Sequence, residues 1–221
     1  MANLMKFDTP NERRYSLGEE IANSITHGIG ALLSAAAIPL LMDAARQSSD
    51  TLSLVGYAIF GVSLVLLFTM STVYHAVTAP RAKKILEILD HSAVYVLIAG
   101  TYSAYCFTAL RGPAGWTLFG LVWGTAAAGI VFKAFFVNRF RIVSTLGYVV
   151  MGWLIAPWFG AVKANIPSIS LTLLVAGGLA YTLGAAIYLF KKVPWFHPLW
   201  HIFVLAGAVC HFFSAYLMFS R

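Results

Sequence analysis

The chain has 221 residues, of which 60% are hydrophobic and only 10% are charged, and its mean hydropathy is +0.79. Soluble domains carry about 25% charged residues, so this composition excludes a soluble globular protein and indicates an integral membrane protein. The net charge of +7 is spread over short segments between apolar runs. This excludes the basic folded face that a nucleic-acid-binding protein needs, and we expect no nucleic acid among the partners.

A membrane-spanning helix needs about 20 mainly apolar residues. Seven runs are long enough, and charged residues, prolines and glycines separate them. The runs cover approximately residues 22–44, 52–76, 86–108, 115–137, 143–163, 169–190 and 197–219. The sequence therefore predicts an all-α integral membrane protein, in which a short N-terminal segment (1–21) precedes a single bundle of seven transmembrane helices (22–219).

The distribution of lysine and arginine predicts the orientation of this bundle. With the N-terminus in the cytoplasm, ten basic residues fall in cytoplasmic segments and four fall outside. The ten are Lys6, Arg13, Arg14, Arg81, Lys83, Lys84, Arg139, Arg141, Lys191 and Lys192, and the four are Arg46, Arg111, Lys163 and Arg221. We therefore expect a cytoplasmic N-terminus and an external C-terminus.

In this orientation, four of the runs bring polar side chains to one layer near the cytoplasmic face. Ionisable groups within a membrane are costly, so a layer of them indicates a functional site. The residues are Glu20, Asn23 and His27 at the first run, Ser71 and His75 in the second, Asp90 and His91 in the third, and His197 and His201 in the seventh.

Three of these histidines have the pattern of a metal site. His197 and His201 are four residues apart, so one helical face presents both imidazoles. A third imidazole from His75 completes a set of three ligands and leaves a fourth position for water, as in catalytic zinc sites. Because no glutamate lies between His197 and His201, the motif is not the HExxH of soluble metalloproteases. The sequence predicts a Zn²⁺ ion here, which lowers the pKa of a bound water to about 7.

Two further side chains are predicted to take part in catalysis. Asp90 is placed to hold or deprotonate the water, and Ser71 to hydrogen-bond to either partner. Ser71 serves equally well as a structural hydrogen bond between helices. His91 follows Asp90 directly and is expected to face about 100° away, toward a neighbouring helix.

The remaining polar residues are expected around this site rather than in it. Glu20, Asn23 and His27 share one helical face and are predicted to form a polar network beside the metal. His211 lies ten residues beyond His201, about 15 Å deeper in the membrane, and is expected to have a packing or gating role. Tryptophans are expected in the aromatic belts at the membrane interfaces; they are Trp153, Trp158, Trp195 and Trp200.

Together these motifs resemble those of the bacterial hemolysin-III proteins, within the progestin and adiponectin receptor (PAQR) superfamily. The resemblance covers residues 17–219 and rests on Glu20-x-x-Asn23-x-x-Thr26-His27, Ser71-x-x-x-His75, Asp90-His91 and His197-x-x-x-His201. It implies seven helices in the bacterial cytoplasmic (inner) membrane and zinc held by His75, His197 and His201. It also implies that Asp90 holds the zinc-bound water and that Ser71 is the serine of the family motif.

Eukaryotic relatives in this superfamily are similar to alkaline ceramidases. The resemblance and the predicted site together favour a zinc-dependent hydrolase of lipid amide or ester bonds, with the acyl chain of a membrane lipid in the bundle interior. Two alternatives are a membrane sensor or receptor with structural zinc, and a cytolysin that permeabilises membranes, as the haemolysin label suggests. The sequence specifies no protein partner.

Overall fold

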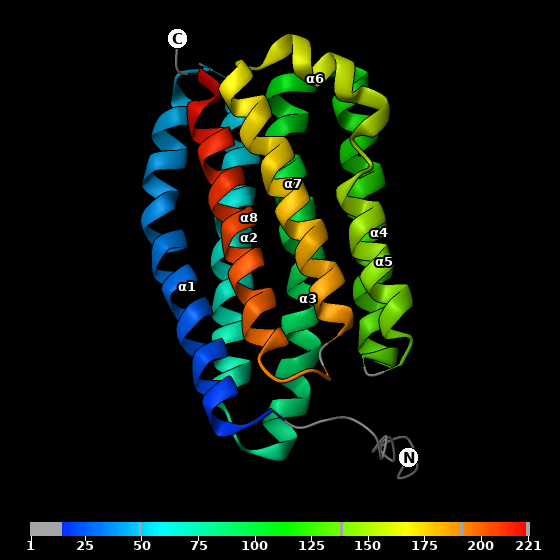
Figure 1. The fold of residues 1–221 in the computed structure, drawn as a ribbon. Coiled ribbons are helices and arrows are strands. Elements are labelled where there is room, and N and C mark those ends of the chain that lie inside the picture. Colours follow the sequence, from blue (N-terminus) through cyan, green and yellow to red (C-terminus); the bar gives the residue numbers. More distant parts are fainter. Residues whose placement is uncertain (1–14, 49, 138, 191, 220–221) are drawn as a thin grey trace.

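A computed structural model describes residues 15–48, 50–137, 139–190 and 192–219. Most of the expected N-terminal segment 1–21, residues 1–14, therefore lies outside the described residues. In the part that is described, the chain is helical without strands, and seven helical segments are long and apolar enough to cross a membrane. This confirms the predicted all-α membrane fold (Figure 1).

The helices follow the predicted runs closely. Their bounds are α1 (Leu17–Arg46), α2 (Thr51–Ala76), α3 (Pro80–Tyr105), α4 (Gly112–Phe136), α5 (Arg141–Gly152), α6 (Phe159–Asn165), α7 (Ser168–Leu189) and α8 (Phe196–Tyr216). A π-helical turn over Cys106–Leu110 extends α3, and 3₁₀ turns lie at Ala156–Trp158 and Leu217–Phe219.

Local chemistry explains where these helices begin. Ser16 caps α1 in a capping box, in which its hydroxyl accepts from the Glu19 N–H and the Glu19 carboxylate accepts from the Ser16 N–H. The Asp50 side chain caps α2 by accepting from the Leu52 N–H. Pro80 opens α3, where its missing N–H breaks no intrahelical hydrogen bond.

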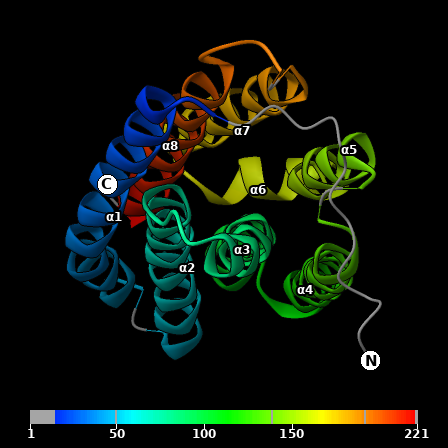
Figure 2. The same ribbon diagram turned by 90° about the horizontal axis from the view of Figure 1, so that it is seen from below.

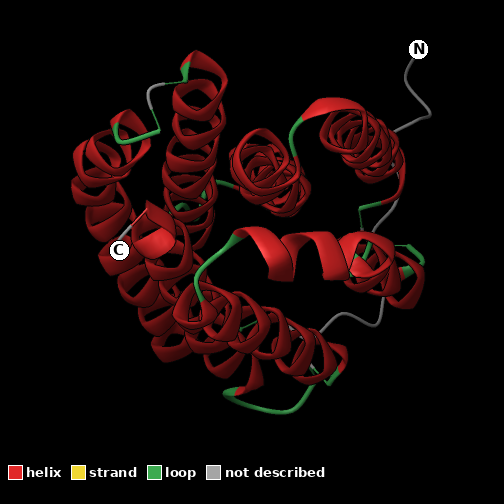
Figure 3. Cartoon of the chain, turned by 90° about the horizontal axis from the view of Figure 1, so that it is seen from above, coloured by secondary structure: helices red, strands yellow, loops and turns green. Residues whose placement is uncertain are grey.

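The fifth predicted span, 143–163, is interrupted. Helix α5 ends at Gly152, the chain turns through Pro157, and α6 then runs across one end of the bundle (Figures 1 and 3). Pro157 donates no hydrogen bond, and its ring would crowd the carbonyl of Trp153, four residues earlier, which disfavours a straight helix through this segment.

The helices enclose an interior that α6 partly covers. Viewed along the bundle, α1, α2 and α8 lie together on one side, α4 and α5 on the other, and α3 lies between α2 and α4 (Figure 2). Close approach between α2 and α3 depends on Gly56, where a Cβ would lie only 2.5 Å from the Ser103 carbonyl oxygen. Large apolar side chains such as Leu32 and Phe135 are exposed on the outside, as lipid contact requires.

Candidate metal centre

Three imidazoles converge between α2 and α8. The Nε2 atom of His197 lies 3.3 Å from Nε2 of His75 and 3.2 Å from Nε2 of His201. One ligand atom from each of the three lies within 4.8 Å of the others, and all three residues are buried. The three histidines could form a metal site, as the sequence pattern predicts.

The spacing of these nitrogens fits a tetrahedral ion. Zinc binds histidine nitrogen at about 2.0–2.1 Å, which places two ligand nitrogens about 3.3 Å apart in tetrahedral geometry. The separations of 3.3 and 3.2 Å agree with this value.

The hydrogen bonds at the far side of two rings determine which nitrogen faces the centre. Nδ1 of His75 lies 2.6 Å from the Glu20 carboxylate, and Nδ1 of His201 lies 3.3 Å from the Asn23 carbonyl. Carboxylate and carbonyl oxygens only accept, so both Nδ1 atoms donate, and in the neutral rings both Nε2 atoms carry bare lone pairs. His197 Nε2 has one proton at most and can satisfy only one of them. Inward-facing imidazole lone pairs of this kind are the groups that ligate a metal ion.

Helix α1 supplies the groups that hold these rings. The other oxygen of Glu20 accepts from Lys83 Nζ at 2.8 Å, so the Glu20 carboxylate bridges His75 and the start of α3. The Asn23 side-chain amide lies 3.4 Å from His75 Nδ1, while its main chain binds His201. The predicted polar network of Glu20 and Asn23 thus contacts two of the three histidines.

The start of α8 is fixed by an unusual backbone conformation. Trp195 has a left-handed φ of 65°, and its N–H donates to a carboxylate oxygen of Glu19 at 2.8 Å. Non-glycine residues rarely adopt this conformation, so the contact with α1 helps to hold it. Pro198 lies in the first turn, where helical N–H groups have no intrahelical acceptor.

His27 lies against the centre without joining it. Its ring stacks on His201 with centroids 3.6 Å apart and meets Phe68 edge-on. Neither nitrogen of His27 has a hydrogen-bond partner among the described residues, and the ring is 1% exposed. This contact places His27 directly beside one of the three converging histidines.

Asp90 and Ser71 are both buried, Asp90 on α3 and Ser71 one turn before His75 on α2. Asp90 lines a cavity, but it is not part of the set of three converging ligands. The Ser71 hydroxyl lies near the Asp90 carboxyl, but the contact does not have the geometry of a hydrogen bond, and the hydroxyl has no other partner within the described chain. The Ser71 hydroxyl therefore keeps hydrogen-bonding capacity for another molecule.

His91 faces α7, in keeping with its predicted direction. Its Nδ1 donates to the Glu87 carbonyl at 2.7 Å, so Nε2 accepts from the Tyr188 hydroxyl at 3.1 Å. The Tyr148 hydroxyl donates to the His91 carbonyl at 2.8 Å. These contacts join α3, α5 and α7 beside Asp90.

Three contributors are absent from the sequence prediction. The Tyr15 ring stacks on His197 with centroids 4.5 Å apart, and Lys83 binds Glu20. Trp200, expected in an interface belt, is half-buried and also lines the cavity, with its ring 4.9 Å from that of His197. Trp200 is three residues from His197, a spacing that places both side chains on one helical face.

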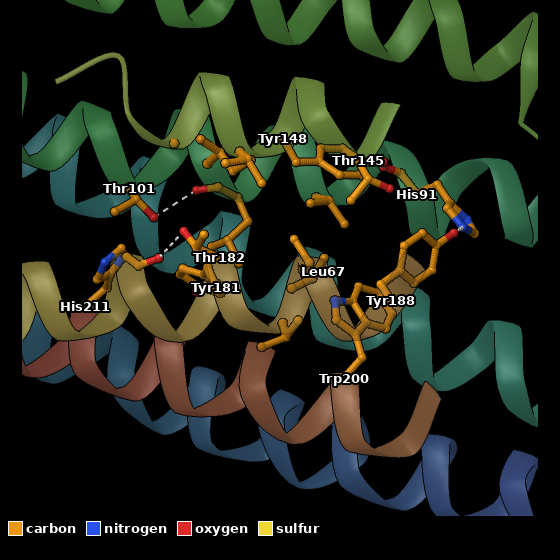
Figure 4. A pocket seen from close by; sticks show the side chains of 18 of the residues that line it. Leu67, His91, Thr101, Thr145, Tyr148, Tyr181, Thr182, Tyr188, Trp200 and His211 are labelled. Carbon is orange, nitrogen blue, oxygen red and sulfur yellow. Dashed lines mark hydrogen bonds between the residues drawn. The ribbon is translucent and has the colours of Figure 1, made fainter. Parts of the chain in front are cut away.

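An elongated cavity runs away from this centre. A space of about 120 Å³ is lined mainly by α3, α5, α7 and α8 (Figure 4). Its lining includes Asp90 and also His27, whose ring stacks on His201. A second space of about 370 Å³ lies toward α6 and shares Thr101 and His211 with the first. Most of the lining side chains are aromatic or aliphatic, which suits an alkyl chain.

Comparison with known proteins matches this arrangement to one family. The model of the family described as "Haemolysin-III related" matches residues 15–212, a range that includes all three converging histidines and Asp90. The chain belongs to this family. It is 46% identical over 195 residues to "Hemolysin-3" of Bacillus cereus, covering 88% of this chain and 89% of the relative. It is also 46% identical over 199 residues to the "Hemolysin-3 homolog" of Bacillus subtilis (90% and 93%).

More distant similarity extends to animals. The human "Monocyte to macrophage differentiation factor" is 26% identical over 227 residues, covering 98% of this chain and 92% of the relative. No solved structure matches the chain significantly. As a member of the haemolysin-III family with seven spanning segments, the protein is an integral membrane protein.

Proposed function

We propose that this haemolysin-III family member is a zinc-dependent hydrolase of lipid amide or ester bonds. One observation carries the proposal: Nε2 of His197 lies within 3.3 Å of Nε2 of both His75 and His201, and an apolar cavity whose lining includes Asp90 reaches this cluster at His27. Such a combination brings a metal, a proton acceptor and a chain-binding space together.

His75, His197 and His201 would hold the ion, and imidazole ligands favour zinc over magnesium or calcium, which prefer oxygen. When bound, zinc supplies a Lewis acid that polarises a carbonyl and activates water near neutral pH. Glu20 and Asn23 hold two of the rings with Nε2 directed inward, a role that outer hydrogen bonds commonly have in metal sites.

Asp90 is proposed as the catalytic acid and base. Its position at the end of the cavity allows it to take a proton from water and to deliver one to the leaving amine or alcohol. Ser71 interacts with Asp90 and orients that carboxyl. His27 and His91 also line this end of the cavity, where they shape the surroundings of the reacting bond.

The cavity binds the acyl chain of the lipid. Side chains such as Leu67, Val94 and Leu97 line it near the centre, and aromatic rings close its sides. Burial of an alkyl chain there excludes water from all but the reacting end.

We also propose that the protein resides in the bacterial inner membrane with a cytoplasmic N-terminus. The excess of basic residues in segments on the side of the histidines supports this orientation. The metal centre then lies near the cytoplasmic face.

Quantitative lipid analysis of membranes containing the wild-type protein or Asp90→Asn tests the hydrolase. We expect wild-type protein to deplete a lipid amide or ester and release its fatty acid, and Asp90→Asn to slow this at least about 100-fold while retaining zinc. Asp43→Asn, an exposed acidic residue at the other end of α1, is the matched control and should behave as wild type. Unchanged turnover in Asp90→Asn, with lower thermal stability after chelation, would instead support a sensor with structural zinc.

The name of the Bacillus cereus relative, "Hemolysin-3", favours membrane permeabilisation as a second candidate. Dye leakage from liposomes containing purified protein separates the two functions. Leakage that persists after zinc is removed and in Asp90→Asn supports the cytolysin. Leakage that requires both zinc and Asp90 supports lipid hydrolysis as its cause.

A further inference from the structure

The cavity contains a second polar region far from the metal centre, formed by His211 of α8 and Tyr181 of α7. His211 follows His201 by ten residues in one continuous helix, which places it about 15 Å further along the axis. Its side chain lines both cavity spaces and is 8% exposed, and Tyr181 lines the space that reaches Asp90 (Figure 4).

The hydrogen bonding of His211 defines what it can bind. Its Nε2 lies 3.1 Å from the Leu174 carbonyl, which only accepts, so Nε2 carries the proton. In the neutral ring Nδ1 is then an acceptor, and it has no partner among the described residues. The Tyr181 hydroxyl also lacks a partner there, although it is inaccessible to solvent. Unsatisfied buried polar atoms are rare and need an explanation.

Two glycines provide the space for these rings. A Cβ on Gly177 would lie 2.3 Å from His211 Cδ2, and a Cβ on Gly207 would lie 2.8 Å from Tyr181 Cε1. The His211 and Tyr181 rings meet at 71° with centroids 5.2 Å apart. The packing of α7 against α8 is thus built around these two polar side chains.

We propose that His211 and Tyr181 bind a hydroxyl group carried by the chain of the lipid substrate. This inference rests on the proposed function, in which the chain lies in the cavity. A hydroxyl donates to the bare Nδ1 and accepts from Tyr181, whereas a keto group or a double bond offers no proton to Nδ1.

The distance between the two sites sets the position of that hydroxyl. An extended chain of tetrahedral atoms advances about 1.2 Å per bond, as the polypeptide backbone does. A separation of about 15 Å therefore corresponds to roughly twelve bonds from the scissile carbonyl. Water is the other source of a hydroxyl, and the experiment must separate it from lipid.

Binding of three fatty acids to the zinc-loaded protein in nanodiscs tests the inference. The probes are stearic acid, 12-hydroxystearic acid and 2-hydroxystearic acid, the last as a control for hydroxyl position. We expect 12-hydroxystearic acid to bind about three- to tenfold more tightly than stearic acid, as one or two net hydrogen bonds predict. In His211→Phe this ratio should fall to about one, while the affinity for stearic acid stays within about twofold.

Tyr181→Phe removes a single oxygen and provides a second, milder variant, in which the ratio should also fall. If His211→Phe does not fold, Tyr181→Phe provides the test of the inference. Equal binding of the 12-hydroxy and unsubstituted acids by wild-type protein overturns the inference and leaves water as the occupant, with the proposed acyl cavity intact. A preference that survives both variants also overturns it. Absence of binding by all three acids contradicts the acyl cavity itself, and the inference with it.

Discussion

His75 donates a hydrogen bond from Nδ1 to the Glu20 carboxylate across 2.6 Å, and this contact determines which nitrogen of His75 faces His197. It joins α1 to α2 at the level where α8 supplies the other two histidines. A carboxylate behind a ligating histidine fixes the ring and raises its basicity. We therefore expect Glu20 to act as a positioning residue for metal binding.

Glu20→Ala should weaken zinc binding about 10- to 100-fold, because the mutation removes the acceptor that holds His75. Competition with a fluorescent zinc chelator measures the change on purified protein. Glu20→Gln retains an acceptor and should show a smaller loss.

Lys83→Met is the matched control for Glu20. Lys83 binds the outer oxygen of Glu20, but its side chain is 28% exposed, and exposed ion pairs contribute little. We expect zinc affinity to change by less than about fivefold. A larger effect of Lys83→Met than of Glu20→Ala would contradict the positioning role of Glu20.

Replacement of His75, His197 and His201 by alanine together should abolish zinc binding. Elemental analysis of purified wild-type protein should find about one zinc per chain, and the triple variant almost none. His211→Phe is the control, since His211 is buried elsewhere on α8 and should leave the zinc content unchanged. Zinc retained by the triple variant would sink the proposed metal centre.

Zinc removal should also lower thermal stability, because the three ligands join α2 to α8 and a ligand that binds only the folded state stabilises it. Wild-type protein should lose several degrees of Tm after chelation and recover with zinc but not magnesium. The triple alanine variant should show no zinc-dependent shift in Tm.

The sequence predicts the helices and the convergence of the three histidines well, for a physical reason. The bilayer requires long apolar helices, and the excess of basic residues on one side determines the direction in which each helix crosses the membrane. Residues at helix ends can therefore be assigned a common depth. The i, i+4 spacing of His197 and His201 then gives direction as well as depth.

Features that depend on lateral packing escape this reasoning. Depth does not reveal which helices are neighbours, so the pairing of Glu20 with His75 and the inward position of Trp200 come only from the structure. The break in the fifth span at Pro157 is visible in the sequence as a proline, but its consequence, α6 lying across the bundle end, is not. The stacking of Tyr15 on His197 comes from a residue before the first apolar run.

The orientation can be tested independently of zinc. Alkaline phosphatase fused after residue 221 should be active, because it folds only outside the cytoplasm and the predicted C-terminus is external. A green fluorescent protein fused at the same point should be dark, because this fusion also lies outside the cytoplasm. The opposite pattern would place the histidines near the outer face and overturn the proposed orientation.

Gly56→Ala should destabilise the bundle, because the added Cβ would lie 2.5 Å from the Ser103 carbonyl oxygen and 3.2 Å from the Ala104 Cα, both backbone atoms that cannot rotate away. Helix α3 must then move away from α2, and overpacking of this kind costs about 1–3 kcal/mol in unfolding free energy. Gly124→Ala on α4 is the matched control, since its Cβ would meet nothing within 4 Å. Thermal denaturation in detergent should show a lower midpoint for Gly56→Ala only.

Because α2 carries His75 and α3 carries Asp90, the displacement of α3 in Gly56→Ala should slow lipid turnover more than it weakens zinc binding, whose proposed ligands lie on α2 and α8. Equal losses of both would indicate general unfolding rather than a shift of α3.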